Sequence, residues 1–184
     1  MKKIETLAIA NRGEVAVRII RACQELGIRS VLLHSEADTK SLAYRLADER
    51  VCIGPAPVGE SYLSIERNIE AALAAKAHAV HPGFGFLSEN ADFAQACLDN
   101  KIIFVGPSPD SIRGMGDKVN AKQLAKGLNI PVIPGYEGDD ADVGEIKRQA
   151  AKIGYPVIVK AAGGGGGRGL KVARNEADLE ATVE

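Results

Sequence analysis

The stretch TLAIANRGEVAVRIIRACQELGIRSVLLH, residues 6–34, decides the fold class. It begins with an apolar run over residues 6–10, continues over residues 15–26 with apolar side chains at helical spacing, and ends in a second apolar run over residues 29–34. Strand, helix and strand in this order are typical of a βαβ unit on a parallel sheet. Gly27 is placed to end the helix. The buried face of the helix is predicted to carry Val15, Ile19, Ala22, Cys23 and Leu26.

The same alternation continues to about residue 105. Further helices are predicted at 41–47, 65–76 and 91–99, and further strands at 51–53, 78–81 and 102–105. Ser64 and Asn90 precede two of these helices as N-caps. Right-handed crossovers would arrange the strands as an open parallel sheet with helices on both faces. The sequence therefore predicts an α/β, Rossmann-like first domain.

A second, smaller unit is predicted after Gly106. Helices are expected at 119–128 and 143–153, strands at 155–160 and 170–173, and a further helix from about residue 175. Two strands and two helices make a marginal unit by themselves, so we expect this α+β unit to be incomplete. The predicted division is a Rossmann-like domain over 1–113, a linking helix over 114–130 and a partial subdomain over 131–184.

Composition excludes several classes of protein. The 184 residues carry 23 basic and 24 acidic side chains, a formal charge of −1, which argues against a nucleic-acid or membrane-surface partner. No apolar run approaches the roughly 18 residues of a membrane helix. Cys23, Cys52 and Cys97 are odd in number and far apart, as expected of buried, reduced thiols. Residues 1–5 leave no room for a signal sequence, and we expect a cytoplasmic protein.

The segment KAAGGGGGRG, residues 160–169, is the clearest candidate for ligand binding. Its five consecutive glycines expose backbone N–H groups that can wrap phosphates closely. The segment is no P-loop, because the chain lacks G-K-[ST], and no dinucleotide fingerprint, because a strand rather than a helix follows. We predict a glycine loop that joins two strands and closes over a nucleotide, with Lys160 at its root and Arg168 at its tip. The alternative is a disordered surface linker.

The loop after the first predicted strand is a weaker candidate. It lies at the carboxyl edge of the sheet, where α/β proteins bind ligands. Its sequence, NRGE at residues 11–14, has a single glycine. We therefore favour a tight turn with a charged helix start over a dinucleotide site, and Glu36 and Asp38, although placed like ribose-binding acids, are interpreted in the same way.

The segment HPGFGFLSE, residues 81–89, follows another predicted strand at the same edge. Phe84 and Phe86 either form a wall for a ligand or cap the core, and His81 in the second case makes only local hydrogen bonds. Both interpretations remain open from the sequence. No zinc site is predicted, because His78 and His81 lack a nearby cysteine or third histidine.

These pieces, in this order, resemble the biotin carboxylase component of biotin-dependent carboxylases, a branch of the ATP-grasp ligases. The matching stretches are IANRGE (9–14), ADE (47–49), CIGP (52–55), SYL (61–63), HPGFGFLSEN (81–90), GP (106–107), MGDK (115–118) and residues 155–169. The resemblance spans the chain but covers only the front of the family's catalytic core. That front portion is the Rossmann-like first domain, the linking helix and much of the ATP-grasp lid subdomain.

The resemblance implies a two-step reaction. ATP and bicarbonate give carboxyphosphate, and its carboxyl group then passes to N1 of biotin on a carrier domain. By the resemblance Lys118 and Lys160 bind ATP, and His81, Phe84 and Gly85 lie near biotin, with Phe84 standing where the family often has tyrosine. The loop that covers the phosphates is implied to consist of Gly163, Gly164, Gly165, Gly166, Gly167, Arg168 and Gly169.

Other implied features concern assembly and the rest of the enzyme. Arg21 and Glu25, an i, i+4 pair on the first helix, become candidates for a homodimer interface. The carboxylates for magnesium, the adenine-pocket residues and the groups that handle bicarbonate are expected beyond Glu184, so no catalytic or metal-binding residue is assigned to this chain. We expect the 184 residues alone to be inactive. A biotin carboxyl carrier protein or domain and a carboxyltransferase component are the implied partners.

Three other functions stay open. One is another ATP-grasp ligase, of the carbamoyl-phosphate or glycinamide-ribonucleotide type. A second is a non-catalytic nucleotide-binding or dimerisation module, which would bind nucleotide or dimerise without cleaving ATP. The third is a dinucleotide-dependent dehydrogenase, which tight NAD binding would indicate.

Overall fold

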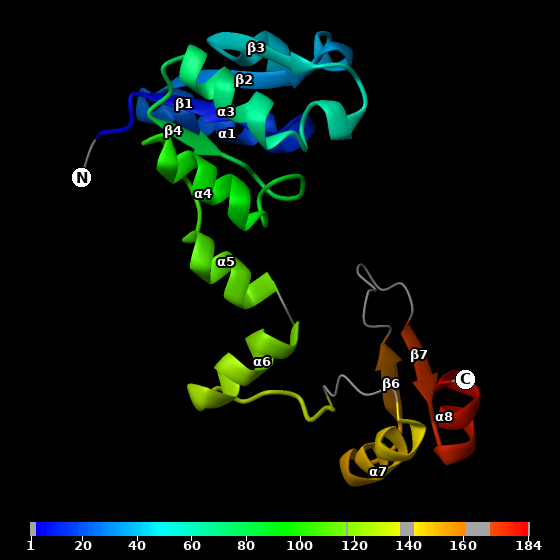
Figure 1. Cartoon of the computed structure of the whole chain (residues 1–184). Helices are drawn as coiled ribbons and strands as arrows, with labels where there is room; N and C mark the ends of the chain where they lie inside the picture. Colours follow the sequence, from blue (N-terminus) through cyan, green and yellow to red (C-terminus); the bar gives the residue numbers. More distant parts are fainter. Residues whose placement is uncertain (1–2, 117, 137–141, 161–169, 184) are drawn as a thin grey trace. The chain divides into compact units, whose positions relative to one another are not determined.

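A parallel sheet organises the N-terminal part of the chain (Figure 1). The computed structural model describes residues 3–116, 118–136, 142–160 and 170–183. The five strands of the sheet are β1 (Thr6–Ile9), β2 (Arg29–Ser35), β3 (Glu49–Gly54), β4 (Ala79–His81) and β5 (Ile103–Phe104). Their order is β3-β2-β1-β4-β5, and all neighbours run parallel. The predicted α/β, Rossmann-like fold class is confirmed.

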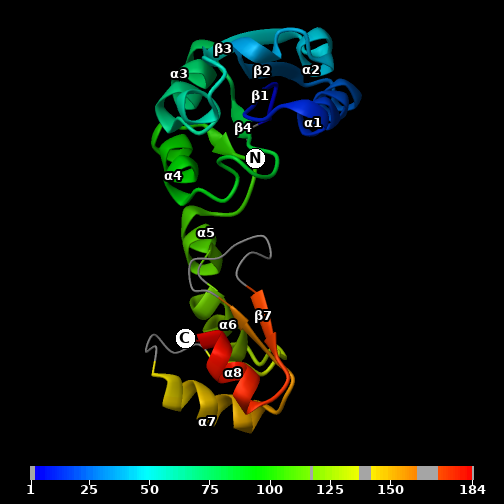
Figure 2. The same ribbon diagram turned by 90° about the vertical axis from the view of Figure 1, so that its right-hand side faces the viewer.

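Helices cover both faces of this sheet (Figure 2). They are α1 (Gly13–Leu26), α2 (Leu42–Leu46), α3 (Ile65–Ala74) and α4 (Ala91–Asp99), with short 3₁₀ turns η1 (Glu36–Asp38) and η2 (Val58–Glu60). Helix α5 (Pro109–Gly116) follows β5 and packs against α4. Helices α1 and α2 lie on one face, and α3 and α4 lie on the other. The chain therefore forms three layers in this part.

The central strand β1 shows why the sheet is covered twice. Leu7 and Ile9 belong to the apolar cluster with α1 and α2, whereas Ala8 and the following Ala10 belong to the cluster with α3 and α4. Successive side chains of a strand point to opposite faces, so an unbroken apolar run needs cover on both. Burial of a side chain such as Ile9 stabilises the fold by about 1.5–3 kcal/mol. The run over residues 6–10 is thus read correctly as a buried parallel strand.

The buried face of α1 differs from the prediction. Ala16, Ile19, Ile20 and Cys23 are buried, while Ala22 is exposed and Leu26 is 72% exposed. Leu26 lies in the last turn, just before Gly27 reverses the chain in a left-handed conformation and donates to carbonyls of that turn. The predicted stripe was therefore wrong at Ala22 and Leu26, and the buried face includes Ala16 and Ile20 instead.

The predicted helix starts at Ser64 and Asn90 are confirmed. The Ser64 hydroxyl accepts from the Arg67 N–H at 3.4 Å, and the Asn90 side chain accepts from the Phe93 N–H at 2.9 Å. Helix α5 was not predicted. Its signal is Ser108 followed by Pro109, since the Ser108 hydroxyl accepts from the Ser111 N–H at 3.2 Å and proline suits a first helical turn.

The remaining elements are α6 (Lys118–Gly127), α7 (Val143–Ile153), β6 (Val157–Lys160), β7 (Leu170–Ala173) and α8 (Glu176–Val183). Strands β6 and β7 pair antiparallel, from Val157 opposite Ala173 to Lys160 opposite Leu170. A small core of Ala150, Ala173 and Leu179 joins this hairpin to α7 and α8. The chain divides into two compact units, Met1–Lys118 and Val119–Glu184. The division at residues 113 and 130 stays a prediction.

Candidate functional site

A cavity of about 310 Å³ lies where β1 and β4 end. It is lined by residues 11–15, which join β1 to α1, and by residues 84–86, which follow β4. The strand order reverses between β1 and β4, because the chain moves from β1 to β2 on one side and returns to β4 on the other. Ligands of open α/β sheets bind at such a switch point. The structure thus brings together the two loops singled out in the sequence.

Asn11 connects these two loops. Its side chain is buried, and its amide donates to the carbonyl oxygens of Pro82 at 2.7 Å and Phe84 at 2.9 Å. Its Oδ1 accepts from the Arg12 N–H at 2.9 Å. These bonds satisfy the buried side chain and fix the loop after β4 against the end of β1. Residues 11–14 therefore do more than the tight turn that the sequence favoured.

The turn after β4 has an unusual backbone. Gly83, Gly85 and Phe86 have φ values of +68°, +70° and +43°. Glycine adopts this left-handed region freely, but for a phenylalanine it costs on the order of 1–3 kcal/mol. Phe84 between them is 70% exposed. The turn presents the Phe84 ring to solvent at the rim of the cavity.

The two rings lie in different environments. Phe84 is free to form the wall of a ligand site, while Phe86 is half-buried and packs against the core. His81 makes the expected local hydrogen bond, since its Nδ1 accepts from the Gly83 N–H at 2.9 Å. Burial lowers the pKa of His81, so the ring is neutral at neutral pH and retains this acceptor.

A cluster of polar and aromatic side chains packs against the turn. The Tyr62 ring stacks on Phe86 with a centroid distance of 4.9 Å, and its hydroxyl donates to Asp38 Oδ2 at 2.8 Å. Burial is the main cause that raises the pKa of Tyr62 to about 12. The Arg12 guanidinium carbon lies 5.6 Å from the Tyr62 centroid and 5.7 Å from the Phe86 centroid. Sequence reasoning missed Tyr62, whose only signal was its place in the SYL stretch.

Asp38 is part of this cluster. Its Oδ2 also accepts from the Ser35 hydroxyl at 2.6 Å and lies 3.9 Å from Arg12 Nη1. Two hydroxyl donors therefore use the same oxygen, and the guanidinium of Arg12 stays beyond direct hydrogen-bond distance. These contacts agree with the structural role that the sequence favoured for Asp38 over ribose binding.

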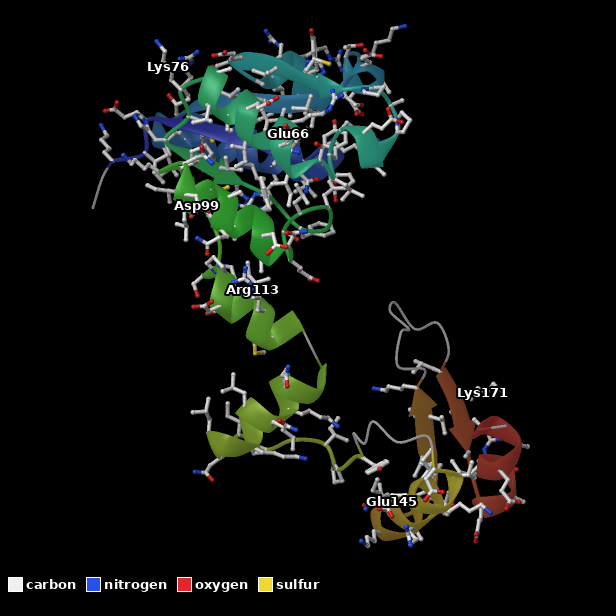
Figure 3. The ribbon with its side chains drawn as sticks, in the orientation of Figure 1. Glu66, Lys76, Asp99, Arg113, Glu145 and Lys171 are labelled. Carbon is white, nitrogen blue, oxygen red and sulfur yellow. The ribbon has the colours of Figure 1, made fainter. Side chains whose placement is uncertain are left out.

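The second candidate site lies on the β6–β7 hairpin. Lys160 is exposed at the end of β6, and the neighbouring exposed side chains on its face of the hairpin are Ile158, Leu170 and Val172. Lys171, on β7, is paired with Val159 and belongs to the opposite face (Figure 3). The glycine loop, Gly163 to Gly169 with Arg168, lies outside the described residues. An apolar face next to a cation suits a ligand that has both a flat apolar ring and an anionic group.

Three further predictions can be placed. Lys118 is the first residue of α6. Arg21 and Glu25 are both exposed on α1, and none of the ion pairs between described residues joins them. Cys52 is exposed, which corrects the expectation of three buried thiols. It lies on β3, at one edge of the described sheet.

Cys23 and Cys97 are buried as expected. Burial raises the pKa of both thiols, that of Cys97 to about 12, and the charge of Asp48 adds to the effect at Cys23. No helix among the described segments is long and apolar enough to cross a membrane.

Comparison with protein families gives two matches. Residues 3–112 match the family described as biotin carboxylase, N-terminal domain. Residues 117–184 match the carbamoyl-phosphate synthase L chain, ATP binding domain.

Curated relatives extend over almost all of this chain. The biotin carboxylase of Haemophilus influenzae is 51% identical over 181 residues, which cover 98% of this chain and 40% of the relative. The mitochondrial propionyl-CoA carboxylase alpha chain of Homo sapiens is 46% identical over 172 residues, which cover 94% of this chain and 24% of the relative. The chain thus spans two fifths or less of the length of these relatives.

Solved structures agree with the sequence matches. The biotin carboxylase of Campylobacter jejuni in a β,γ-ATP complex has a TM-score of 0.90 at 47% identity, over 98% of this chain and 40% of that one. The biotin carboxylase domain dimer of the Hydrogenobacter thermophilus 2-oxoglutarate carboxylase, in complex with MgADP, ADP and bicarbonate, has a TM-score of 0.88 at 44% identity, over 98% and 40% of the two chains.

Proposed function

Because this chain belongs to the family of biotin carboxylase N-terminal domains, we propose that it is the front part of an ATP-dependent ligase that carboxylates biotin. ATP and bicarbonate would form carboxyphosphate, and the carboxyl group would pass to N1 of biotin on a carrier domain. One observation carries the proposal. A single chain has both a preformed loop at the switch point of its sheet and a hairpin whose open face ends in Lys160.

The nucleotide half of the proposal concerns the hairpin. The exposed side chains of Ile158, Leu170 and Val172 fit the apolar base of ATP, and Lys160 beside them fits a phosphate. The proposal therefore revises the expectation that the whole adenine pocket lies beyond Glu184. We assign Lys160 and Lys118 the role of offsetting phosphate charge, and Gly163 to Gly169 the role of covering the phosphates through backbone N–H groups. ATP supplies the phosphoryl group that activates bicarbonate, while these residues bind and orient it.

The biotin half concerns the cavity where β1 and β4 end. His81, Phe84 and Gly85 would form the wall next to biotin, with the exposed Phe84 ring packing on the apolar part of the ligand. His81 is assigned a structural role here, because its Nδ1 accepts from the Gly83 N–H within the turn. These residues would place biotin and leave the chemistry to groups elsewhere in the protein.

Magnesium is assigned to no residue of this chain. Within the part of the chain that the structure describes, no three His, Cys, Asp or Glu side chains are grouped to hold a metal ion. We propose that the carboxylates for magnesium and the groups that bind bicarbonate belong to the rest of the protein, which the relatives have and this chain does not cover. The 184 residues alone are therefore expected to be inactive.

The proposed assembly follows from the same family. A biotin carboxyl carrier protein or domain would deliver biotin, and a carboxyltransferase component would take the carboxyl group onward in the cytoplasm. The Hydrogenobacter thermophilus domain is described as a dimer, and we propose a homodimer of the complete protein with Arg21 and Glu25 of α1 at or near the contact. The charge reversal Arg21→Glu should then shift the complete protein toward monomer in sedimentation.

The test of the function uses the whole protein that contains this chain. Bicarbonate-dependent cleavage of ATP is measured with and without free biotin. The proposal predicts stimulation by biotin, because biotin accepts the carboxyl group and draws the intermediate forward. A rate of ATP cleavage that free biotin does not change would contradict the proposal.

A second candidate is a ligase of the carbamoyl-phosphate type. It is favoured by the match of residues 117–184 to the ATP-binding domain of the carbamoyl-phosphate synthase L chain. In that reaction ammonia would take the place of biotin as the acceptor of the activated carboxyl group. Ammonia and not biotin would therefore stimulate ATP cleavage. The same assay with ammonia in place of biotin separates the two.

A further inference from the structure

One residue of the turn after β4 has a backbone conformation that its residue type does not favour. Gly83 and Gly85 adopt positive φ without strain, but Phe86, with φ +43°, is a bulky side chain in the left-handed region. Such residues persist only where the surrounding structure holds them, and they cluster at functional sites. The reason for the conformation of Phe86 must therefore be sought in its tertiary contacts.

Two side chains hold the Phe86 ring. Tyr62 stacks on it with an interplanar angle of 10° and a centroid distance of 4.9 Å. The Arg12 guanidinium lies over both rings, its central carbon 5.7 Å from the Phe86 centroid. Aromatic pairs and cations over ring faces are both attractive beyond the area they bury. Neither contact comes from within the turn.

Tyr62 is itself held firmly. It is 1% exposed, and its hydroxyl donates to Asp38 Oδ2 and accepts from the Ser35 N–H at 3.1 Å. Buried Asn68 donates to the carbonyl oxygens of residues 61, 62 and 64, which fixes the backbone at Tyr62. The Tyr62 ring is thus a rigid surface, and the turn after β4 adapts to it.

We propose that Tyr62 is a positioning residue for the substrate cavity. By stacking on Phe86 it holds the turn over residues 83–88, and through the turn it holds the exposed Phe84 ring at the rim of the cavity. The identity of the ligand as biotin rests on the proposed function, whereas the stack, the turn and the cavity do not. A wall that is already ordered need not be ordered on binding, so Tyr62 contributes to ligand affinity.

The test replaces each ring of the Tyr62–Phe86 stack in turn. Tyr62→Leu, Phe86→Leu and the double variant form a mutant cycle in the whole protein that contains this chain. The first readout is hydrogen exchange of the Ser88 amide, which donates to the Gly85 carbonyl at 2.9 Å within the turn. Each single variant should raise this exchange roughly three- to tenfold, as expected for loss of an aromatic pair, and the double variant should add little.

The second readout is kinetic. KM for biotin should rise by a similar factor in the variants, without a matching rise in KM for ATP, because the turn lies at the biotin side of the proposed reaction. A merely structural role for Tyr62 would raise both constants together. Equal rises in the two constants would therefore overturn the positioning role.

Tyr44→Leu is the matched control. Tyr44 makes ring contacts with His34 and Arg50 and packs in the cluster with α1 and α2, away from the turn. Its replacement should leave Ser88 exchange unchanged. If Tyr62→Leu does not fold, Phe86→Leu still decides the matter, because Phe86 is half-buried and lies on the turn side of the stack. Unchanged Ser88 exchange in Phe86→Leu would overturn the proposal.

The two proposals can fail separately. If biotin does not change the rate of ATP cleavage in the unmutated protein, the proposed function is contradicted. The exchange experiment would still decide whether Tyr62 holds the turn. If biotin does stimulate ATP cleavage but the effects of Tyr62→Leu and Phe86→Leu on Ser88 exchange are additive, the role of the stack is contradicted and the proposed function still stands.

Discussion

Gly83 and Gly85 have similar φ values in different surroundings. A Cβ on Gly83 would lie 2.5 Å from Val15 Cγ1 and 2.8 Å from Asn11 Nδ2, whereas one on Gly85 would meet nothing within 4 Å. Gly83→Ala should lower the free energy of unfolding by about 2–5 kcal/mol, because overpacking adds to φ strain. Gly85→Ala, with strain alone, should lower it by about 1–2 kcal/mol. Urea unfolding measures both, and equal losses would contradict the packing around Asn11.

The cysteines differ in accessibility. Cys52 is exposed on β3, while Cys23 and Cys97 are buried and burial raises the pKa of each. Since the thiolate is the reactive form, a maleimide should label Cys52 first in the folded protein and reach the other two only after unfolding. Peptide mapping by mass spectrometry checks this. Early labelling of Cys97 would show that α4 is packed differently.

Single residues of the candidate site were predictable where a loop sequence carried the signal. The loop HPGFGFLSE marked Phe84 and Phe86 as a possible wall for a ligand, while the placement of His81, Phe84 and Gly85 near biotin came from the family resemblance and stays a prediction. Tyr62 was not predictable in the same way. Its importance comes from contacts with Asp38 and Phe86, each 24 residues away, and no local pattern reports a contact at that separation.

At the scale of elements, the connection between β4 and α4 should respond to pH. Burial lowers the pKa of His81 below its ordinary 6.5, so the unfolded chain binds a proton there at higher pH than the folded chain does. The folded state therefore loses stability as the pH falls below 6.5, and protonation of Nδ1 would remove the acceptor of the Gly83 N–H.

Urea unfolding at about pH 7.5 and about pH 5.5, on either side of the ordinary histidine pKa, measures this effect. The free energy of unfolding should be lower at the acid pH, and His81→Gln should reduce the difference. A difference that His81→Gln leaves unchanged would assign the acid sensitivity to other groups.

Elements were predictable when a cap or a buried strand marked them. Ser64 and Asn90 fixed two helix starts, and the apolar runs gave every strand of the sheet to within a few residues. The predicted buried face of α1 was wrong at Leu26, because periodicity does not show whether a side chain in the last turn has a packing partner. Helix α5 was not predicted, although Pro109 occupies its first position and Ser108 precedes it as a cap.

At the scale of the whole molecule, the two faces of the β6–β7 hairpin give a matched pair of lysines. Lys160→Ala should weaken ATP binding by roughly 1.5–3 kcal/mol, or about 10- to 150-fold in Kd, as expected for a lost charge-assisted hydrogen bond. Lys171→Ala removes the same charge from the other face and should change Kd far less. Calorimetric titration with ATP in the whole protein checks this, and equal effects would remove Lys160 from the nucleotide site.

The proposed function concerns a protein longer than this chain, which spans 40% of a biotin carboxylase relative. The central claim is that its two candidate sites serve one reaction, ATP-driven carboxylation of biotin. The most direct measurement is the rate of bicarbonate-dependent ATP cleavage by the whole protein as free biotin is added. We predict a saturable rise in rate, with carboxybiotin formed. A rate that biotin does not change, or that rises with ammonia instead, would contradict the claim.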